Sequence, residues 1–405
     1  MRTFARIILT ATLLTYAFCA VAQNAGGAVN AQLISVNEGL SQTTITDVLI
    51  DSYGFMWVGT QDGLNRYDGY GFKSYRHQPL DSTTILSNYI YSLCEDSKGN
   101  IWVATAQGLS CFMRDKGYFN TYTSSIYDVN TLSSNRVFSV LQDKEGFIWA
   151  KTLESLDKLD VKSGQVIRYS HYNDFFTFPA ENNSFGMLED SNGKLWVGTK
   201  DGLLYFDRAL QMFKRYQFEA GNANSLSNNQ VKCLYEDSNG VLWIGTENGL
   251  NRYNSELDNF QRYYHVGHRG HLAQENVVNA IGEDVNGKLW LGTDRGLCQF
   301  SDNVKDYSLF TGLYNQENKL IQTPVTALVQ DGNKIMWIGS LQGLIKWDQK
   351  SQKFKAYTTA KNGKPLFENN FVASITQGSS DIIWVGTWGA GIFKYNRATD
   401  ANTRY

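Results

Sequence analysis

Cysteine and histidine are scarce in this chain, which limits the disulfides and metal sites that it can form. The sequence contains five of each among 405 residues. After the first 22 residues no two cysteines share C-x-x-C spacing, and a chain of this length needs no disulfide framework to hold its core, although thiols in an exported protein can also pair. The sequence therefore predicts isolated buried thiols. They are Cys94, Cys111, Cys233 and Cys298.

Histidine clusters once, in the segment HVGHRGH at residues 265–271. Three imidazoles at intervals of three can hold a metal ion, but a loop without a cysteine ligand is weak ground for such a site. We interpret the segment as a surface loop. We expect no metal, no cofactor and no catalytic residue in this chain.

The sequence has no run of basic residues and no second long apolar run. Its formal net charge is −2, and without clustered Lys or Arg it has no means to neutralise a phosphate backbone. Beyond the N-terminus no apolar segment is long enough to cross a bilayer. The composition therefore argues against nucleic acid as a partner and against membrane insertion of this chain.

The N-terminus has the features of a secretory signal peptide. Two arginines precede an apolar stretch over residues 7–18, and small residues follow up to Ala22. We expect cleavage after Ala22, so that residues 1–22 form a signal peptide and residues 23–405 form a periplasmic or otherwise exported domain. Cys19 raises the alternative of a lipoprotein, but the bulky residue before it fits a lipid-attachment box poorly.

A long internal repeat dominates the rest of the sequence. Tryptophan recurs with a spacing of 45 residues once and 47 residues six times, a period typical of propellers and solenoids. The repeated residues are Trp57, Trp102, Trp149, Trp196, Trp243, Trp290, Trp337 and Trp384.

Each repeat contains the same short elements, as in DSNGVLWIGTENGLNRYN at residues 237–254. Asp and Gly before the Trp predict a tight turn, because Asp bonds to the backbone two residues on and Gly accepts a positive φ. The apolar run around the Trp is too short for a helix and predicts a buried strand. Gly-Thr-x-x-Gly predicts a hairpin turn into a third strand, and aromatic residues such as those at 260–263 predict a fourth.

Four antiparallel strands per repeat make one propeller blade. We therefore predict an all-β fold, a β-propeller of eight four-stranded repeats, with each Trp packed between neighbouring blades. Residues 32–37 match an outer strand that has no preceding blade, and the last repeat lacks an outer strand, so pairing the two would close an eight-bladed ring. The alternative is seven blades plus the start of a second propeller. We favour eight, because repeat seven already owns an outer strand at residues 353–357.

The repeat motif D-S-x-G-x-x-W-[VI]-G-T-x-x-G-L-x-R-Y-[DN], clearest at residues 51–68 and 237–254, closely resembles the two-component regulator propeller repeat. In that family the repeats usually form the periplasmic sensor region of hybrid two-component system histidine kinases. Many members sense oligosaccharides and control polysaccharide-utilisation genes.

The resemblance implies a periplasmic ligand-sensing propeller for signal transduction, with an oligosaccharide as its ligand. It also implies a histidine kinase region in the same or a partner chain, and it is compatible with a homodimer. The 405 residues contain no kinase. We therefore expect the C-terminal signalling part beyond residue 405 or in a partner, and any kinase activity to reside there.

One face of the predicted propeller carries both the Gly-Thr-x-x-Gly turns and the connections between blades, where a loop-borne recognition surface is expected. Trp388 is our best candidate for stacking on a sugar. Repeat three departs from the pattern, with Lys151 in place of Gly and Glu154 in its turn. The further candidates in the turns are Lys200, Asp201, Glu247, Asn248, Asp294 and Arg295.

An asparagine stands fourteen residues before the Trp in six repeats. These residues could form a polar ring that binds sugar hydroxyls, but Asn at a junction between loop and strand more often closes an Asx turn, which we favour. The set is Asn88, Asn135, Asn182, Asn229, Asn276 and Asn370, and we keep Asn88, Asn135, Asn229 and Asn276 as ligand candidates.

Two other functional classes compete with a sensor. A secreted propeller glycosidase or lyase needs a privileged acid and base, which near-uniform repeats do not provide. A scaffold for protein-protein interaction fits the fold equally well, because propellers host many functions. We predict a non-enzymatic sensor.

Overall fold

The computed structural model describes residues 31–169, 186–265, 276–301, 306–309, 323–331, 333–351, 353–357, 371–378 and 381–396. Several residues named in the predictions lie outside these ranges. These are the residues of the signal peptide and His171, His268, His271, Asn182 and Asn370.

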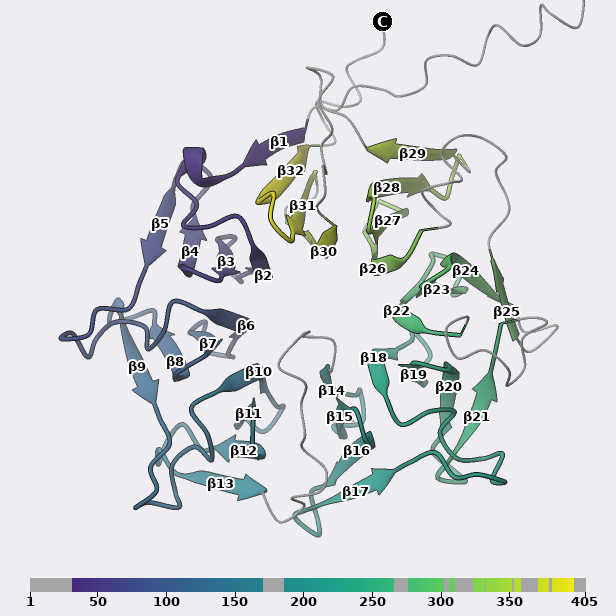
Figure 1. The fold of residues 1–405 in the computed structure, drawn as a ribbon, viewed down its shortest axis with the longest axis horizontal. Helices are drawn as coiled ribbons and strands as arrows, with labels where there is room; N and C mark the ends of the chain where they lie inside the picture. Colours follow the sequence, from purple (N-terminus) through teal and green to yellow (C-terminus); the bar gives the residue numbers. More distant parts are fainter. Residues whose placement is uncertain are drawn as a thin grey trace, which may run out of the picture.

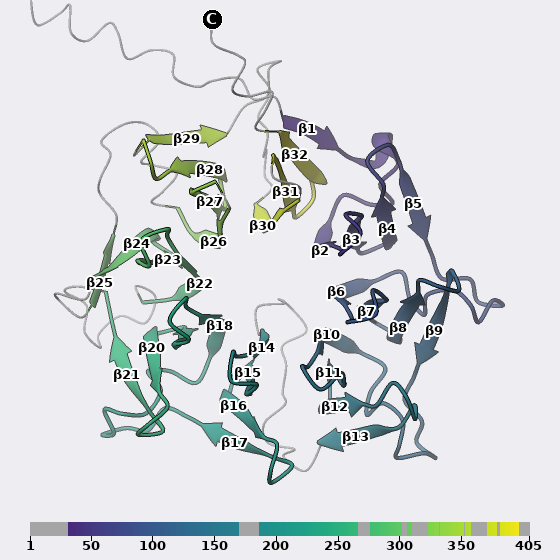
Figure 2. The same cartoon turned by 180° about the vertical axis from the view of Figure 1, so that it is seen from behind.

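Eight antiparallel sheets of four strands each stand around a common centre (Figure 1). In seven of them the order along the chain is also the order in space, from an inner strand at the centre to an outer strand at the rim. Figure 2 shows the same ring from behind. The predicted all-β, eight-bladed β-propeller is therefore confirmed. In the described part of the chain, helical structure is confined to the 3-10 helix η1 at Val36–Glu38.

The strands fall into four columns, from the centre to the rim. The inner strands are β2 (Ile45–Ile50), β6 (Ile90–Glu95), β10 (Val137–Gln142), β14 (Met187–Glu189), β18 (Val231–Glu236), β22 (Val278–Glu283), β26 (Val325–Gln330) and β30 (Val372–Gln377). The second strands are β3 (Met56–Thr60), β7 (Ile101–Thr105), β11 (Ile148–Thr152), β15 (Leu195–Thr199), β19 (Leu242–Thr246), β23 (Leu289–Thr293), β27 (Ile335–Ser340) and β31 (Ile382–Thr387). The third strands are β4 (Gly63–Tyr67), β8 (Gly108–Met113), β12 (Leu156–Leu159), β16 (Gly202–Asp207), β20 (Gly249–Asn254), β24 (Gly296–Ser301), β28 (Gly343–Asp348) and β32 (Ile392–Asn396). The outer strands are β5 (Phe72–Tyr75), β9 (Tyr118–Tyr122), β13 (Val166–Tyr169), β17 (Met212–Tyr216), β21 (Asn259–Tyr263), β25 (Asp306–Leu309), β29 (Lys353–Tyr357) and β1 (Ala31–Ile34).

The repeated Asp and Trp are bonded to each other. In the first blade Asp51 accepts the backbone N–H of Phe55 through Oδ1 at 2.9 Å and the indole N–H of Trp57 through Oδ2 at 2.8 Å. The same carboxylate-indole bond, between 2.6 and 3.0 Å long, occurs in seven blades. In the eighth blade Gly378 stands six residues before Trp384, where the other blades have Asp. The hydrogen bond from the indole thus stabilises the Asp turn, in addition to the packing of the Trp ring between blades.

The Trp side chains lie between neighbouring blades. Trp57 is fully buried, and its ring centroid lies 5.3 Å from that of Phe112 in the next blade and 5.7 Å from that of Tyr75 in its own. Equivalent clusters fill the other interfaces. Burying an aromatic side chain contributes roughly 2 to 3 kcal/mol, so this column is a main source of stability. The predicted packing role of the repeated Trp is confirmed.

The Gly-Thr-x-x-Gly turn is held by its own threonine. Thr246 donates from Oγ1 to the carbonyl of Gly249 at 2.9 Å and accepts the N–H of Asn248 at 3.1 Å. The hydroxyl-carbonyl bond recurs in all eight blades, with Ser340 replacing Thr in the seventh. The first glycine allows close approach of blades, because a Cβ at Gly245 would lie 2.8 Å from a backbone oxygen of the next blade.

The first and last strands close the ring. β1 pairs with β32 in antiparallel register, from Ala31 opposite Tyr395 to Ile34 opposite Ile392, and supplies the outer strand of the eighth blade (Figure 1). The favoured eight-bladed closure is confirmed. The strand is shorter than the predicted residues 32–37, because Ser35 caps the short helix that follows.

All four cysteines of the described chain are free thiols, and Cys111 and Cys298 are buried, as predicted. Cys94 and Cys233 are only partly buried, so the prediction of burial is wrong for these two. His265 is 9% exposed, so the first histidine of HVGHRGH does not lie on the surface as predicted. Among the described residues no helix has the length and apolar character needed to cross a bilayer. The same residues hold no cluster of three or more metal-ligating side chains.

Candidate functional site

The antiparallel order of each blade places its turns on two faces. The turns between second and third strands share one face with the connections between blades, which we call the turn face. The Asp turns and the turns between third and outer strands share the other, which we call the Asp face. This arrangement follows from the strand order β2-β3-β4-β5 and its repeats, and it agrees with the two faces expected from the sequence.

The four asparagines of the column that the structure describes do not form the Asx turns that the sequence favours. Asn88 Oδ1 accepts the N–H of His77, eleven residues earlier, at 2.8 Å. The turn is made by the preceding residue, since Ser87 Oγ accepts the N–H of Tyr89 at 3.1 Å. The same bond to an N–H eleven residues earlier is made by Asn135, Asn229 and Asn276. In these four connections the asparagine side chain thus holds the inter-blade connection against the start of the next inner strand.

These asparagines also bind the turn of the preceding blade. Asn276 Nδ2 lies 3.0 Å from Asn248 Oδ1, and the carbonyl of Asn276 accepts the N–H of Gly249 at 2.8 Å. Asn88 binds Asp62 in the same way at 3.1 Å. Two candidate ligand residues, Asn248 and Asn276, are thereby brought together. The ring of asparagines as a sugar site stays a prediction.

A cavity of about 410 Å³ opens on the turn face over blades five to seven. Its polar wall consists of Lys232 and Asn279 on the inner strands β18 and β22, Asp294 in the turn after β23, and Thr326 on β26. Its apolar wall consists of Pro324 and Leu341.

The polar groups of this cavity are held in pairs. Lys232 Nζ lies 2.8 Å from Glu247 Oε1, and Asn279 Nδ2 donates to Asp294 Oδ1 at 2.7 Å. Each pair joins an inner strand to a neighbouring Gly-Thr-x-x-Gly turn. The structure therefore places the predicted residue Asp294 in the cavity wall, and Glu247 next to the cavity through its ion pair with Lys232. Arg295, beside Asp294, is exposed.

The predicted residues of blades three and four are placed differently. Glu154 is exposed and its N–H donates to Thr152 Oγ1 at 3.2 Å, which leaves its carboxylate at the surface. Lys151 is only 3% exposed, and burial lowers the pKa of its ammonium group to about 7. Lys200 and Asp201 are half-buried in the turn of blade four, away from the residues that line the cavity.

Trp388 lies in the irregular turn of blade eight and is 40% exposed. Its ring is stacked on Phe371 with centroids 6.0 Å apart and an angle of 8° between the planes. The backbone N–H of Trp388 donates to the Phe371 carbonyl at 3.1 Å. The exposed part of this ring leaves stacking on a sugar a prediction, and Trp388 does not line the cavity over blades five to seven.

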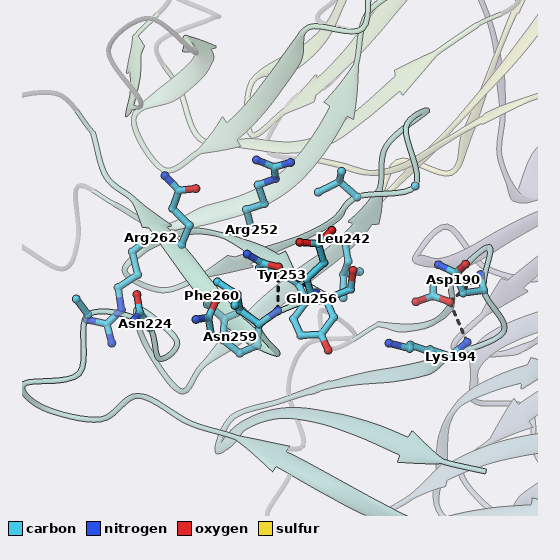
Figure 3. A pocket seen from close by; sticks show the side chains of 18 of the residues that line it. Asp190, Lys194, Asn224, Leu242, Arg252, Tyr253, Glu256, Asn259, Phe260 and Arg262 are labelled. Carbon is cyan, nitrogen blue, oxygen red and sulfur yellow. Dashed lines mark hydrogen bonds between the residues drawn. The ribbon is translucent and has the colours of Figure 1, made fainter. Parts of the chain in front are cut away.

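A larger cavity, of about 980 Å³, was not predicted from the sequence. It extends from the Asp turns of blades four and five across the hairpin formed by β20 and β21 (Figure 3). Asp190 and Lys194 of blade four lie at one end of the close-up, and Arg262 lies at the other. An alignment of the repeats within this chain could have found it, because Ser255 occupies a position that is Arg in repeats two and four.

Comparison with known proteins supports the repeat assignment. A sequence profile described as the two component regulator propeller matches residues 39–62, 84–107, 179–201, 225–248 and 272–295. Histidine kinase P4 of Formosa agariphila is 54% identical over 48 residues, which are 12% of this chain and 4% of the kinase.

Solved structures share the fold. The extracellular domain of a proposed one component system from B. thetaiotaomicron is 19% identical over 87% of this chain, with a TM-score of 0.51. The match covers 52% of that solved chain, so this chain spans about half of it. The propeller of Dos1 is 12% identical, and the match covers 91% of this chain and 95% of that one with a TM-score of 0.60. At these identities the likeness concerns the fold.

Proposed function

Because the chain carries repeats of the two-component regulator propeller family, we propose that it is an exported ligand-sensing propeller that binds an oligosaccharide on its turn face. The ligand signal would pass to a histidine kinase region in the same or a partner chain and control polysaccharide-utilisation genes. The matched segment of a histidine kinase and the fold of an extracellular domain support this proposal. The signal peptide predicted from residues 1–22 supports export.

The observation that carries the proposal is the cavity over blades five to seven. A sugar offers hydroxyls that donate and accept, together with apolar C–H faces. Lys232 and Asn279 supply donors, Asp294 supplies an acceptor, and Leu341 supplies apolar surface. Because inner strands and turns hold these groups in pairs, they are positioned before a ligand arrives.

A glycan-array screen of the mature protein, followed by calorimetry with any hit, tests the proposal. We expect a glycan to bind unchanged and Asp294→Asn or Asn279→Ala to weaken binding by about tenfold, the effect of losing a hydrogen bond to a bound ligand. Leu257→Ala, at an exposed site on the Asp face, is the matched control and should bind as the parent does. Equal loss in the control would place the site elsewhere.

A scaffold for protein-protein interaction is the second candidate. The connection between β9 and β10 exposes three apolar side chains, Ile126, Tyr127 and Val129, at 89%, 93% and 72%. Adjacent exposed apolar groups favour a protein partner. Binding of proteins but of no glycan would support the scaffold, whereas hydrolysis or elimination of a bound glycan would support a glycosidase or lyase.

A further inference from the structure

The turns that join third and outer strands share a left-handed residue at the same position in blades two to five. Counted from the eleventh residue after the repeated Trp, and including the strand ends, each spans six residues, and the fifth adopts a positive φ: 75° at Gly117, 76° at Gly164, 53° at Gln211 and 51° at Asp258. In blades four and five the side chain of the first residue, Asp207 or Asn254, accepts the N–H groups two and three residues on. The second residue of each turn therefore occupies an equivalent position in the four blades. It is Arg114, Val161, Arg208 and Ser255 in turn.

Where this residue is arginine, it fills the groove between two blades on the Asp face. Arg114 donates from Nε to the carbonyl of Gly99 at 2.7 Å and from one terminal nitrogen to Asp51 Oδ2 of the preceding blade at 2.6 Å. Arg208 repeats both contacts, with Gly193 at 3.0 Å and Asp143 at 3.1 Å. The guanidinium joins the Asp turns of two blades.

Where the residue is Ser255, the large cavity takes the place of the arginine. The two corresponding acceptors, the carboxylate of Asp190 and the backbone of Gly240, both line it. Asp190 is only 6% exposed, and the side-chain donor to its Oδ2 is the indole N–H of Trp196 at 2.9 Å. No ion pair among the described residues includes Asp190. The cavity thus holds the acceptors of a guanidinium site without the guanidinium.

Three cationic side chains line the same cavity, and none of them bridges the Asp190 carboxylate and the Gly240 backbone. Lys194 donates its backbone N–H to Asp190 at 2.8 Å, whereas its side chain points away (Figure 3) and its Nζ lies 5.5 and 5.6 Å from the ring centroids of Tyr205 and Tyr253. Arg262 is held by the carbonyls of Ser225 and Asn222 at the other end. Arg252 is exposed on β20.

The groove between blades three and four shows that a lysine and an arginine fit beside one such carboxylate. There Lys158 Nζ lies over the Phe147 ring at 3.8 Å while Arg208 binds Asp143. Lys194 stands where Phe147 stands in blade three, four residues after the Asp. By comparison with Lys158 and Arg208, the ammonium group of Lys194 does not exclude a guanidinium beside Asp190.

The groove between blades two and three also lacks an arginine, but it differs from the cavity between blades four and five. Between blades two and three Val161 leaves a smaller cavity, of about 300 Å³. There the side chain of Asn100 donates to Asp96 Oδ2 at 3.0 Å. The second donor that Asp190 lacks is thus already present at Asp96.

We propose that the cavity between blades four and five binds a guanidinium group, which bridges the Asp190 carboxylate and the Gly240 carbonyl as Arg114 and Arg208 do in the sister grooves. The group can come from an arginine side chain of a partner protein or from a small free guanidine. A planar guanidinium can reach a carboxylate and a carbonyl at once through its fixed fork of donors, which an ammonium group cannot. This site lies on the opposite face from the proposed oligosaccharide site and does not depend on it.

The test is a titration of the mature protein with acetyl-Gly-Arg-Gly-amide, acetyl-Gly-Lys-Gly-amide and agmatine, followed by the indole N–H resonances in NMR. The resonance of Trp196, assigned with Trp196→Phe, reports on Asp190 directly because the two are hydrogen-bonded. We expect the arginine peptide and agmatine to shift it, the lysine peptide to bind about tenfold more weakly, and the resonance of Trp149, beside the filled groove, to stay unchanged.

Two variants complete the design. Ser255→Arg should abolish the shift by filling the site from within, and Ser255→Ala, the matched control, should keep it. Tighter binding of the peptide than of agmatine would identify a protein arginine as the source, and the reverse order a free guanidine. The proposal is overturned if Trp196 does not respond to either guanidine, or if it responds equally to the lysine peptide or in Ser255→Arg.

Discussion

Among blades one to five, the grooves on the Asp face are either bridged by an arginine or open, although the blades share one architecture. Between blades one and two, and between blades three and four, an arginine of the later blade binds the Asp of the earlier one. Between blades four and five the same turn carries Ser255, and a cavity of about 980 Å³ lies there instead. A single position, twelve residues after the repeated Trp, thus decides whether neighbouring Asp turns are bridged or open. Repetition of the backbone does not imply repetition of the surface.

The seam between blades eight and one is of a third kind. Gly378 replaces the Asp of blade eight and Gly69 occupies the arginine position of blade one, so neither partner of the bridge is present. The seam relies on the pairing of β1 with β32 and on the bond from the Gly391 N–H to the Thr43 carbonyl at 2.9 Å. The three kinds of groove lead to four predictions.

Deleting residues 31–37 should have the largest effect, because it removes the outer strand of blade eight and exposes the edge of β32. We expect a loss of about 5 kcal/mol or more, enough to unfold a typical domain, measured by thermal melting followed by circular dichroism. Ser35→Ala, which removes only the cap of the short helix, should cost about 1 kcal/mol. An unchanged melting temperature in the deletion variant would show that the ring does not depend on this seam.

Arg208→Ala should destabilise the protein by about 3 kcal/mol, because it leaves the buried carboxylate of Asp143 without its cation. Urea unfolding followed by tryptophan fluorescence measures the change. Arg76→Ala provides the comparison, since Arg76 and Asp62 form an ion pair in which both side chains are about half exposed, and should cost less than about 1 kcal/mol. Equal effects of the two substitutions would remove the distinction between filled and open grooves.

Lys151, which is buried on β11 of blade three, should make stability depend on pH. Burial lowers the folded-state pKa to about 7, below that of the unfolded chain, so above pH 7 the unfolded state holds the additional proton and stability rises with pH. We expect the free energy of unfolding to rise by about 2 kcal/mol from pH 7 to pH 9 relative to Lys151→Met. Parallel pH profiles of the two proteins would contradict this assignment.

Ser255→Arg should have the smallest effect, a gain of about 1 kcal/mol, because the new ion pair must offset the desolvation of both groups. Val161→Arg should gain less, since Asp96 already receives a bond from Asn100. Differential scanning fluorimetry compares the two, and a crystal structure of Ser255→Arg shows whether the guanidinium reaches Asp190. A larger gain for Val161→Arg would contradict the account of the two open grooves.

Most of the fold could be predicted from the sequence because the repeat encodes local interactions. The Asp that closes a turn, the Thr that holds the next one and the Trp between them act within a dozen residues of each other, as Asp51, Thr60 and Trp57 show. The site could be predicted only in part. Glu247 and Asp294 were found as turn residues, but their partners Lys232 and Asn279 lie on inner strands, whose pattern predicts burial and not a role at the surface.

The sequence by itself determined the number of repeats, the order of strands in each blade and the assignment of turns to two faces, because these follow from periodicity and local turn chemistry. Only the tertiary structure decided which groups meet across blades. The bond of each asparagine to an N–H eleven residues earlier, the burial of Lys151 and the open acceptors at Asp190 depend on how one blade lies against the next. Such contacts depend on loops, turns and neighbouring repeats lying against one another, and their geometry exists only once the ring has formed.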